Sequence, residues 1–264
     1  MINPPYDDEN VIWPLSNGTK IKTSTKRAVV TPTNLLRSMD DNSIDKALVM
    51  ATSICSNTHL SEIVKNYSDR LIGFAWVDDP KDSDKAVVQL DEAILQLGLS
   101  GLKLHPDMQN FSPADPLIIP LIERAAELGI PVLIHSCPGI MGRGYFSHNL
   151  PENVDTLKKH VPEATIIIAH MGYSRYLDLL TIGQIPGVYI ETSWGLTTIT
   201  DLHGMGFMSK FIRRVGVDNF LYGSDWVGPH GEMERQLGII EKLDLNTEEK
   251  DKILGENIRE VMNL

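Results

Sequence analysis

Residues 165–172 read TIIIAHMG, and they decide the fold class because a run of branched apolar side chains ends abruptly in a histidine. Residues 131–136 (PVLIHS) and 220–226 (FLYGSDW) share this design: apolar residues, then a polar group able to do chemistry. Near-continuous apolar runs of this length are typical of strands buried on both faces, as in a parallel sheet. The other runs of this kind are 46–51 (KALVMA), 71–77 (LIGFAWV), 101–104 (GLKL) and 188–191 (VYIE).

Amphipathic stretches separate these runs. Residues 82–97 and 120–128 carry apolar side chains at helical spacing, and each is followed by a glycine that can end a helix. Residues 27–38 resemble a helix that precedes the 46–51 strand. The last helix begins at 247–250, where Thr247 is the expected N-cap and an acidic first turn follows. The alternation predicts a parallel α/β fold.

The position of the polar residues favours a barrel over an open sheet. The predicted strands end in or are followed by Lys103, His105, His135, His170, Glu191 and Asp225. The carboxyl ends of barrel strands all face one mouth, where such folds keep their active sites. No glycine-rich phosphate loop follows an early strand, as a doubly wound sheet would require. We therefore predict a TIM-type (β/α)8 barrel.

One strand of the expected eight is missing, since the runs number seven. The missing strand would be the first. Residues 1–26 are rich in Pro, Asn, Asp and Thr and are interpreted as loop, so a strand ahead of them would lie upstream of Met1. Without it, the strands at 46–51 and 220–223 are expected to have bare edges, a destabilising arrangement that invites pairing with other chains.

Composition narrows the class of protein. The 264 residues are 42% hydrophobic and 22% charged, which is typical of one globular domain spanning 1–264. A formal net charge of −11 disfavours nucleic acid and anionic membranes as partners. There is no apolar run of about 18 residues and no signal peptide, so we expect a cytoplasmic protein. Two cysteines are too few for a disulfide framework or a thiolate zinc site.

Three strand-end residues form a candidate metal site. Imidazole and carboxylate are the ligand types of zinc, manganese or iron, and His135, His170 and Asp225 supply them at one rim. A metal there lowers the pKa of bound water or polarises a carbonyl, and a neighbouring unligated histidine or aspartate moves the proton.

At these residues the chain resembles the amidohydrolase superfamily, in particular the group of aminocarboxymuconate-semialdehyde and resorcylate-type decarboxylases. The resembling segments are 101–106 (GLKLHP), 123–136 (ERAAELGIPVLIHS), 164–172 (ATIIIAHMG), 188–193 (VYIETS), 220–226 (FLYGSDW) and 255–264 (GENIREVMNL). The resemblance implies a (β/α)8 barrel with one divalent metal, zinc first and manganese second. It also implies that His135 binds the metal, that His170 is catalytic, and that Asp225 both binds metal and handles protons.

One departure from the family pattern concerns the metal. The family's first strand ends in a His-x-His pair that supplies two ligands, whereas the first histidine here is His59. The matched ligands are His135 and Asp225, and three protein ligands are the usual minimum for a catalytic ion. We expect an upstream start that restores the pair. The alternative is loss of the metal.

Four residues are predicted to contact substrate. Other amidohydrolase branches carbamylate a lysine at the position of Lys103, and the carbamate bridges two metals. Because bridging also needs the missing His-x-His pair, we interpret Lys103 as a charged strut in the barrel mouth or as a contact to a substrate carboxylate. We also expect it to pair with Glu191. His105, Arg143 and Trp226 complete the set.

The predicted function is a metal-dependent hydrolase or decarboxylase acting on a small cyclic or carboxylated substrate. The sequence does not choose between the two reactions. The alternative is a non-catalytic, metal-free barrel that serves as a binding or structural subunit. The expected partner is a small molecule, and a homo-oligomer is left open.

Overall fold

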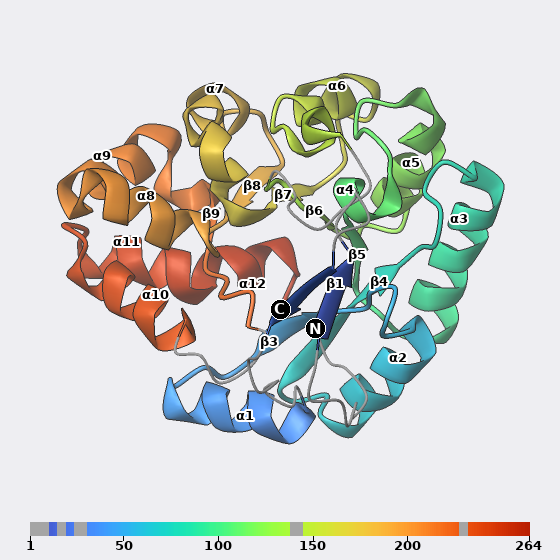
Figure 1. Ribbon diagram of the computed structural model, residues 1–264, viewed down its shortest axis with the longest axis horizontal. Helices are drawn as coiled ribbons and strands as arrows, with labels where there is room; N and C mark the ends of the chain where they lie inside the picture. The colour runs from blue at the N-terminus through green and yellow to red at the C-terminus, as the bar shows by residue number, and fades with distance from the viewer. Residues whose placement is uncertain (1–10, 15–19, 24–30, 138–144, 227–231) are drawn as a thin grey trace.

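The computed structural model describes residues 11–14, 20–23, 31–137, 145–226 and 232–264. Its centre is a curled sheet of seven parallel strands in the order β3-β4-β5-β6-β7-β8-β9, surrounded by helices (Figure 1). The strands are β3 Ala47–Met50, β4 Leu71–Trp76, β5 Gly101–Leu104, β6 Val132–Ile134, β7 Ile166–Ile168, β8 Val188–Glu191 and β9 Phe220–Leu221. All seven predicted strands are confirmed, and they form a TIM-type barrel sheet in which no described strand takes the place of the expected first one.

A helical segment follows each strand before the next begins. The α-helices are α1 Pro32–Asp41, α2 Asn57–Asn66, α3 Ser83–Asp91, α4 Pro106–Gln109, α5 Ile119–Glu127, α6 Asn153–His160, α7 Leu179–Ile182, α8 Gly195–His203, α9 Met205–Val215, α10 Glu232–Lys242, α11 Thr247–Asp251 and α12 Asn257–Val261. None of the described helices is long and apolar enough to cross a membrane.

Two helix starts differ from the prediction. The helix expected over 27–38 begins at Pro32, with the hydroxyl of Thr31 accepting from the amide of Asn34 and the proline ring at the first turn. The cap of α11 is Asn246 rather than Thr247. Its side chain accepts from the amide of Glu249, whose carboxylate accepts from the Asn246 amide in return, so a capping box sets this start.

The open edge at β9 is partly covered, which corrects the expectation of a bare edge there. The amide of Tyr222 donates to the carbonyl of Ile253 at 2.8 Å, and the side-chain amide of Asn257 donates to the carbonyl of Phe220 at 2.8 Å. Residues just before α12 and at its start therefore supply partners that a strand would otherwise provide. At the other edge, β3 pairs only with β4 within the described residues.

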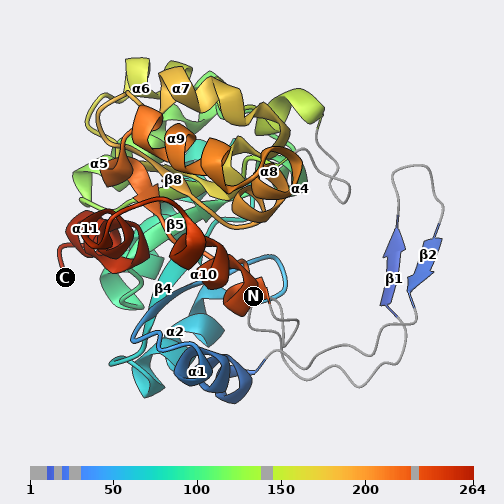
Figure 2. The same ribbon diagram turned by 90° about the vertical axis from the view of Figure 1, so that its left-hand side faces the viewer.

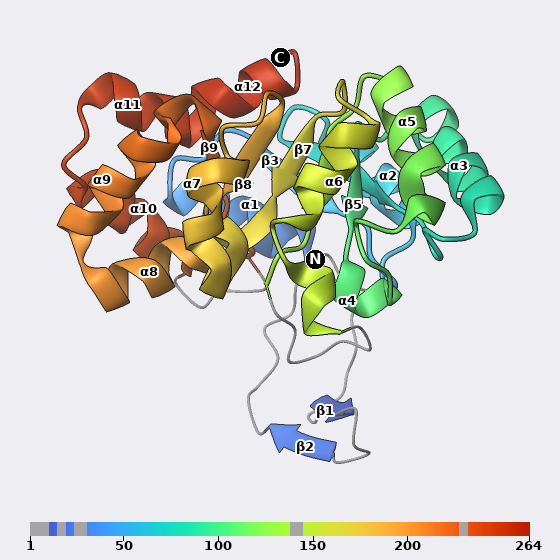
Figure 3. The same ribbon diagram turned by 90° about the horizontal axis from the view of Figure 1, so that it is seen from above.

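The sheet is buried on both faces. Its outer face packs against the helices, and its inner face forms a second cluster of Phe74, Leu133, Ile167, Ala169 and Leu221. Ile258, Val261 and Met262, in and after α12, pack against this inner cluster. Figure 3 shows α12 at the opposite end of the barrel from α4, which follows the carboxyl end of β5. The C-terminal helix thus covers the end away from the mouth.

Part of the segment predicted as loop is paired. Within residues 1–26, β1 Val11–Pro14 and β2 Lys20–Thr23 form an antiparallel pair that is separate from the barrel sheet (Figure 2). The alternation of apolar and polar side chains in these two short stretches was too brief to be read as strand from the sequence.

Candidate functional site

The carboxyl ends of the strands bring two predicted site residues into direct contact. His135 follows β6, and His170 lies just after β7 in the helical turn η4 Ala169–Asp178. Nε2 of His170 lies 2.9 Å from Nδ1 of His135. The ring of His105, which follows β5, stacks on that of His135 with centroids 3.7 Å apart. The three histidines therefore form one cluster.

Successive side chains of a strand point to opposite faces of the sheet, and this alternation explains why His135 and Lys103 point into the barrel. Leu133 belongs to the inner cluster, so His135, two residues on, faces the same side. In β5, a methyl group at Gly101 would meet the ring of Phe74 at 2.5 Å, which places position 101 on the inner face. Lys103 shares that face.

His170 reaches the interior by a different route. Ala169 faces inward, so a continued strand would turn His170 outward. The backbone at His170 is instead left-handed, with φ of 61°, and this reverses the direction of the side chain. Trp194 and Asp225, after β8 and β9, are also left-handed, with φ of 55° and 45°. Non-glycine residues in this region store strain, which clusters at functional sites.

A chain of hydrogen bonds continues from the histidine pair. Nδ1 of His170 lies 2.7 Å from Oγ of Ser193, and that hydroxyl donates to Oε2 of Glu191 at 2.7 Å. A hydroxyl has one hydrogen, so Nδ1 of His170 must be the donor to Ser193. Nε2 of His135 lies 2.9 Å from the carbonyl of Cys137 and must donate to it. Two neutral imidazoles carry two N–H protons and the three contacts need three, so the pair can take up one further proton and pass it on.

Glu191 is fixed by its neighbours and has no ion pair with Lys103 among the described residues. Oε1 of Glu191 accepts from the amide of Ser193 at 2.8 Å, and Oε2 accepts from the amide of His170 at 3.1 Å. A Cβ at position 223 would lie 1.8 Å from Oε1, so only glycine fits there. The predicted direct ion pair between Glu191 and Lys103 is therefore wrong, because amides and the Ser193 hydroxyl occupy the carboxylate, although its charge still favours the protonated form of Lys103.

Burial controls the electrostatics of the cluster. It lowers the pKa of His170, of His135 and of His105, the last to about 3, and the charge of Lys103 lowers all three further. Burial also lowers the pKa of Lys103 to about 8, against the attraction of Asp225 and Glu191. Burial therefore disfavours a positive charge on each imidazole, and it weakens without removing that of Lys103 near neutral pH.

Asp225 lies at the mouth and is exposed. Desolvation by the surrounding protein raises its pKa, but His170, the hydrogen bond from Trp194 and the charge of Lys103 together lower it below the usual value. Nε1 of Trp194 donates to Oδ2 of Asp225 at 2.7 Å. The carboxylate is thus held in its charged form.

Of the remaining residues predicted to contact substrate, the structure describes Trp226 but not Arg143. Trp226 is half-buried and packs against the outer core, whereas Trp194, which sequence reasoning missed, reaches the site through Asp225. Arg143 lies outside the described residues. Ser193 was missed as well. The one available signal was the polar run in residues 191–194 (ETSW), which starts at the last residue of β8.

The described residues do not fit a three-ligand metal site. They contain no group of three His, Cys, Asp or Glu side chains arranged to hold an ion. Both ring nitrogens of His135 already contact protein atoms, and one oxygen of Asp225 is bonded to Trp194. A catalytic divalent ion normally takes three protein ligands.

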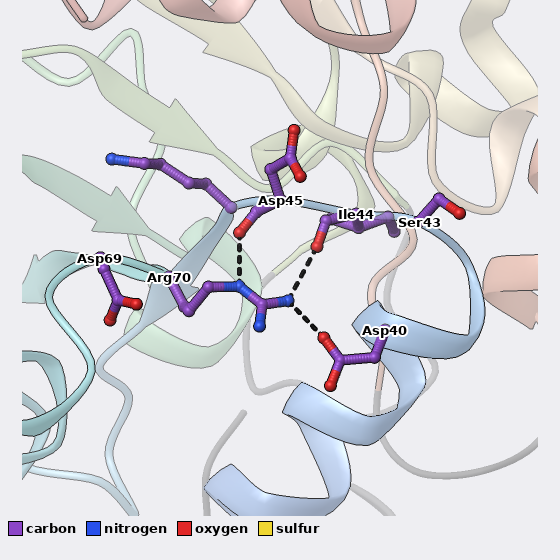
Figure 4. A pocket seen from close by; sticks show the side chains of 7 residues that line it. Asp40, Ser43, Ile44, Asp45, Asp69 and Arg70 are labelled. Carbon is purple, nitrogen blue, oxygen red and sulfur yellow. Dashed lines mark hydrogen bonds and ion pairs between the residues drawn. The ribbon is translucent and has the colours of Figure 1, made fainter.

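A cavity of about 610 Å³ lies at the opposite end of the sheet. Figure 4 shows Arg70 at its centre, donating to the carbonyls of Asp45 and Ile44 and to the carboxylate of Asp40, at 2.7, 3.0 and 2.7 Å. These residues join the end of α1 to the starts of β3 and β4. Since amino-terminal faces of such barrels serve stability, we assign this cavity a structural role.

Parallel strands whose carboxyl ends converge on histidines and an aspartate define the class of TIM-type barrel enzymes with a polar mouth. Residues 20–264 match the family model described as Amidohydrolase, and the chain belongs to this family.

A curated relative is 2-amino-3-carboxymuconate-6-semialdehyde decarboxylase of Dictyostelium discoideum, which is 22% identical over an alignment of 241 residues that covers 79% of this chain. The match spans 65% of the length of that relative.

Two solved structures are similar in fold. The 2,6-dihydroxybenzoate decarboxylase from Rhizobium has a TM-score of 0.72 and 17% identity, with 89% of this chain and 90% of that chain covered. A dihydroxybenzoic acid decarboxylase from Polaromonas sp. JS666, with bound manganese and 2-nitroresorcinol, has a TM-score of 0.66 and 17% identity, with 89% and 87% covered. At these identities the likeness concerns the fold, and the manganese belongs to that relative.

Proposed function

We propose that this protein is an enzyme that decarboxylates a small carboxylated substrate, cyclic or aromatic. The observation that carries the proposal is the hydrogen-bonded chain from His135 through His170 and Ser193 to Glu191. Loss of CO2 leaves an electron pair on carbon, and that carbon must be protonated before product leaves. A pair of hydrogen-bonded imidazoles that can take up a proton and pass it on is suited to this delivery.

The other site residues bind and orient the substrate in this proposal. Lys103 is the buried cation that faces the interior, and His105, directly after β5, lies within the influence of its charge. Trp194 is 42% exposed, and its hydrogen bond to Asp225 holds the ring at the mouth, where it can cover a flat substrate. Roles for Arg143 and Trp226 in binding remain predictions, as do a cytoplasmic location and a homo-oligomer.

A divalent ion is part of the proposal through family membership, with zinc expected first and manganese second. The described residues supply His135 and Asp225, which are two ligand-type groups rather than three. No step above runs through the ion. The test is to measure metal content after purification without chelators, and turnover before and after the metal is removed. Stoichiometric metal, together with loss of turnover on its removal, supports a role for the ion.

The test of the proposed function uses a panel of hydroxybenzoates and cyclic 3-oxo acids in D2O. We expect release of CO2 and appearance of deuterium at the carbon that carried the carboxylate, followed by NMR. His170→Ala should abolish both signals, whereas Ser209→Ala, in α9 away from the site, should retain them. Ring opening of a carboxylated lactone without CO2 release would instead support the hydrolase reading.

A further inference from the structure

The side-chain amide of Gln109 lies between the ends of two neighbouring strands. The ladder of β4 and β5 ends with Trp76 opposite Lys103. Directly after it, the backbone amide of His105 donates to Oε1 of Gln109 at 2.6 Å, and Nε2 of Gln109 donates to the carbonyl of Val77 at 2.6 Å. Gln109 therefore joins the two strand ends in place of a further ladder bond.

This pair of bonds requires an amide side chain at position 109. An amide both donates and accepts, whereas a carboxylate only accepts and a thioether is a weak acceptor with no hydrogen to donate. His105 is the N-cap of α4 and Gln109 is the last residue of that helix, so one turn brings the side chain back to the backbone of its own cap. The fold therefore uses Gln109 to fix the backbone at His105.

The ring of His105 is held in one tautomer by its role as a cap. Its Nδ1 accepts from the backbone amide of Met108 at 3.3 Å. A ring nitrogen that accepts carries no hydrogen, so the single hydrogen of this neutral imidazole is on Nε2. No hydrogen bond among the described residues engages that Nε2, and His105 is partly exposed. His105 thus presents an unused N–H donor at the mouth.

The position of this donor relates it to the proton-delivering histidines. The ring of His105 is stacked on that of His135, with centroids 3.7 Å apart and planes 14° apart, and His135 in turn contacts His170. An oxygen bound at the edge of the His105 ring therefore lies beside the imidazole pair. The hydrogen bonds of Gln109 are to backbone groups, so its influence on a bound molecule passes through His105.

We propose that Gln109 is a positioning residue that holds His105 as a neutral Nε2–H donor to an oxygen of the substrate. The inference rests on the proposed decarboxylase function and deepens it, because it assigns the substrate a carboxylate or phenolate oxygen beside the His105 ring. A donor whose tautomer and backbone are fixed in advance needs no reorganisation when substrate binds. Without Gln109 the peptide at His105 is released, and the donor is no longer held in place.

Nitrogen NMR of the full chain with isotope-labelled histidine tests the positioning role without any need for turnover. We expect the His105 ring, assigned by its absence in His105→Phe, to show the Nε2–H tautomer near neutral pH. Gln109→Met, which keeps the size but loses both bonds, should shift the ring toward a mixture of tautomers. Gln109→Glu, which can accept from His105 but cannot donate to Val77, should do the same to a smaller extent.

Asn57→Leu is the matched control, because it removes the same kind of amide clamp from a neighbouring place. Oδ1 of Asn57 accepts from the Trp76 amide and Nδ2 donates to the Trp76 carbonyl, each at 2.8 Å. Its thermal melt should fall as that of Gln109→Met does, while the His105 spectrum stays that of wild type. With a panel member that turns over, Gln109→Met should raise KM by about 10-fold at nearly unchanged kcat, and Asn57→Leu should not.

A binding probe separates this inference from the function on which it rests. Addition of 2-hydroxybenzoate should displace the Nε2–H resonance of His105 in wild type and less so in Gln109→Met. That result supports the inference even if no panel member releases CO2, an outcome that would refute the decarboxylase proposal alone. An Nδ1–H tautomer in wild type, a resonance that 2-hydroxybenzoate leaves in place, or an unchanged KM in a folded Gln109→Met variant would each overturn the inference and leave the decarboxylase proposal standing.

Discussion

Nε2 of His170 lies 2.9 Å from Nδ1 of His135, although the two residues come from different strands and are 35 positions apart. The contact depends on the left-handed backbone at His170, which turns its ring toward the inner face. Both rings also have a second polar partner, Ser193 for one and the Cys137 carbonyl for the other. Their orientation is therefore set before substrate binds, which general acid–base catalysis requires.

Replacing His170 by Ala should reduce turnover by about 10²–10⁴-fold, because the proton donor is lost. Asp225→Asn should also lose activity, since an amide supplies neither the charge nor the proton acceptor. If a divalent ion binds, Asp225→Asn should lose it and His170→Ala should keep more of it. Steady-state rates and metal analysis of both variants check this; equal metal loss in the two would show that the role of His170 is misassigned.

Replacing Ser193 by Ala should lower activity and also the free energy of unfolding by about 1–3 kcal/mol, because Nδ1 of His170 loses its buried acceptor. Ser209→Ala is the matched control. Ser209 is buried to a similar degree, donates to the Met205 carbonyl and accepts from the Asp244 amide, but it lies away from the site. Denaturant melts should show comparable losses for both variants, with activity lost only in the first. Full activity in Ser193→Ala would remove Ser193 from the proton path.

Replacing Gly223 by Ala should destabilise the protein by about 1–3 kcal/mol and displace Glu191, because the new methyl group would overlap Oε1. Gly238→Ala in α10 is the control. A Cβ there meets nothing within 4 Å, so the change should stabilise by about 0.5–1 kcal/mol through helix propensity. Thermal melts of the two variants should move in opposite directions. A Gly223→Ala protein as stable and active as wild type would contradict the placement of Glu191.

Replacing Lys103 by Met should abolish activity and yet raise the free energy of unfolding near pH 7. Burial lowers the pKa of Lys103 from 10.5 to about 8, so the folded state holds its charge unfavourably, at a cost of up to about 3 kcal/mol. The sign follows from linkage: wild-type stability rises with pH between about 8 and 10.5, as the folded protein loses this proton before the unfolded chain does. The advantage of Met should therefore shrink over that range.

The control for this prediction is Lys158→Met. The Lys158 ammonium donates to two carbonyls, so its removal leaves buried acceptors and should destabilise the protein by about 1–3 kcal/mol. Urea melts at several pH values measure both variants. Destabilisation of Lys103→Met at neutral pH would mean that Lys103 has partners in the folded protein.

The protein should also lose stability as the pH falls below about 6.5. Burial lowers the pKa of His105 to about 3 and holds that of His135 well below its ordinary value. As the pH falls below about 6.5, these histidines therefore bind protons in the unfolded chain but not in the folded protein. His105→Asn should flatten the slope of unfolding free energy against pH between about 6.5 and 4. An unchanged slope in that variant would show that His105 is already charged, or open to solvent, in the folded state.

The strands could be predicted from the sequence because burial on both faces leaves a local trace, a run of branched apolar residues ending at a polar one. The same pattern, a polar residue at the carboxyl end of an apolar run, predicted that Lys103, His135, His170 and Asp225 lie at one mouth of the barrel. The link from His170 through Ser193 to Glu191 was not predictable, since it depends on a left-handed φ and on distances between strands. It was also not predictable that Trp194, rather than Trp226, donates a hydrogen bond to Asp225. Backbone dihedrals and approaches across strands are set by tertiary packing, which no short stretch of sequence specifies.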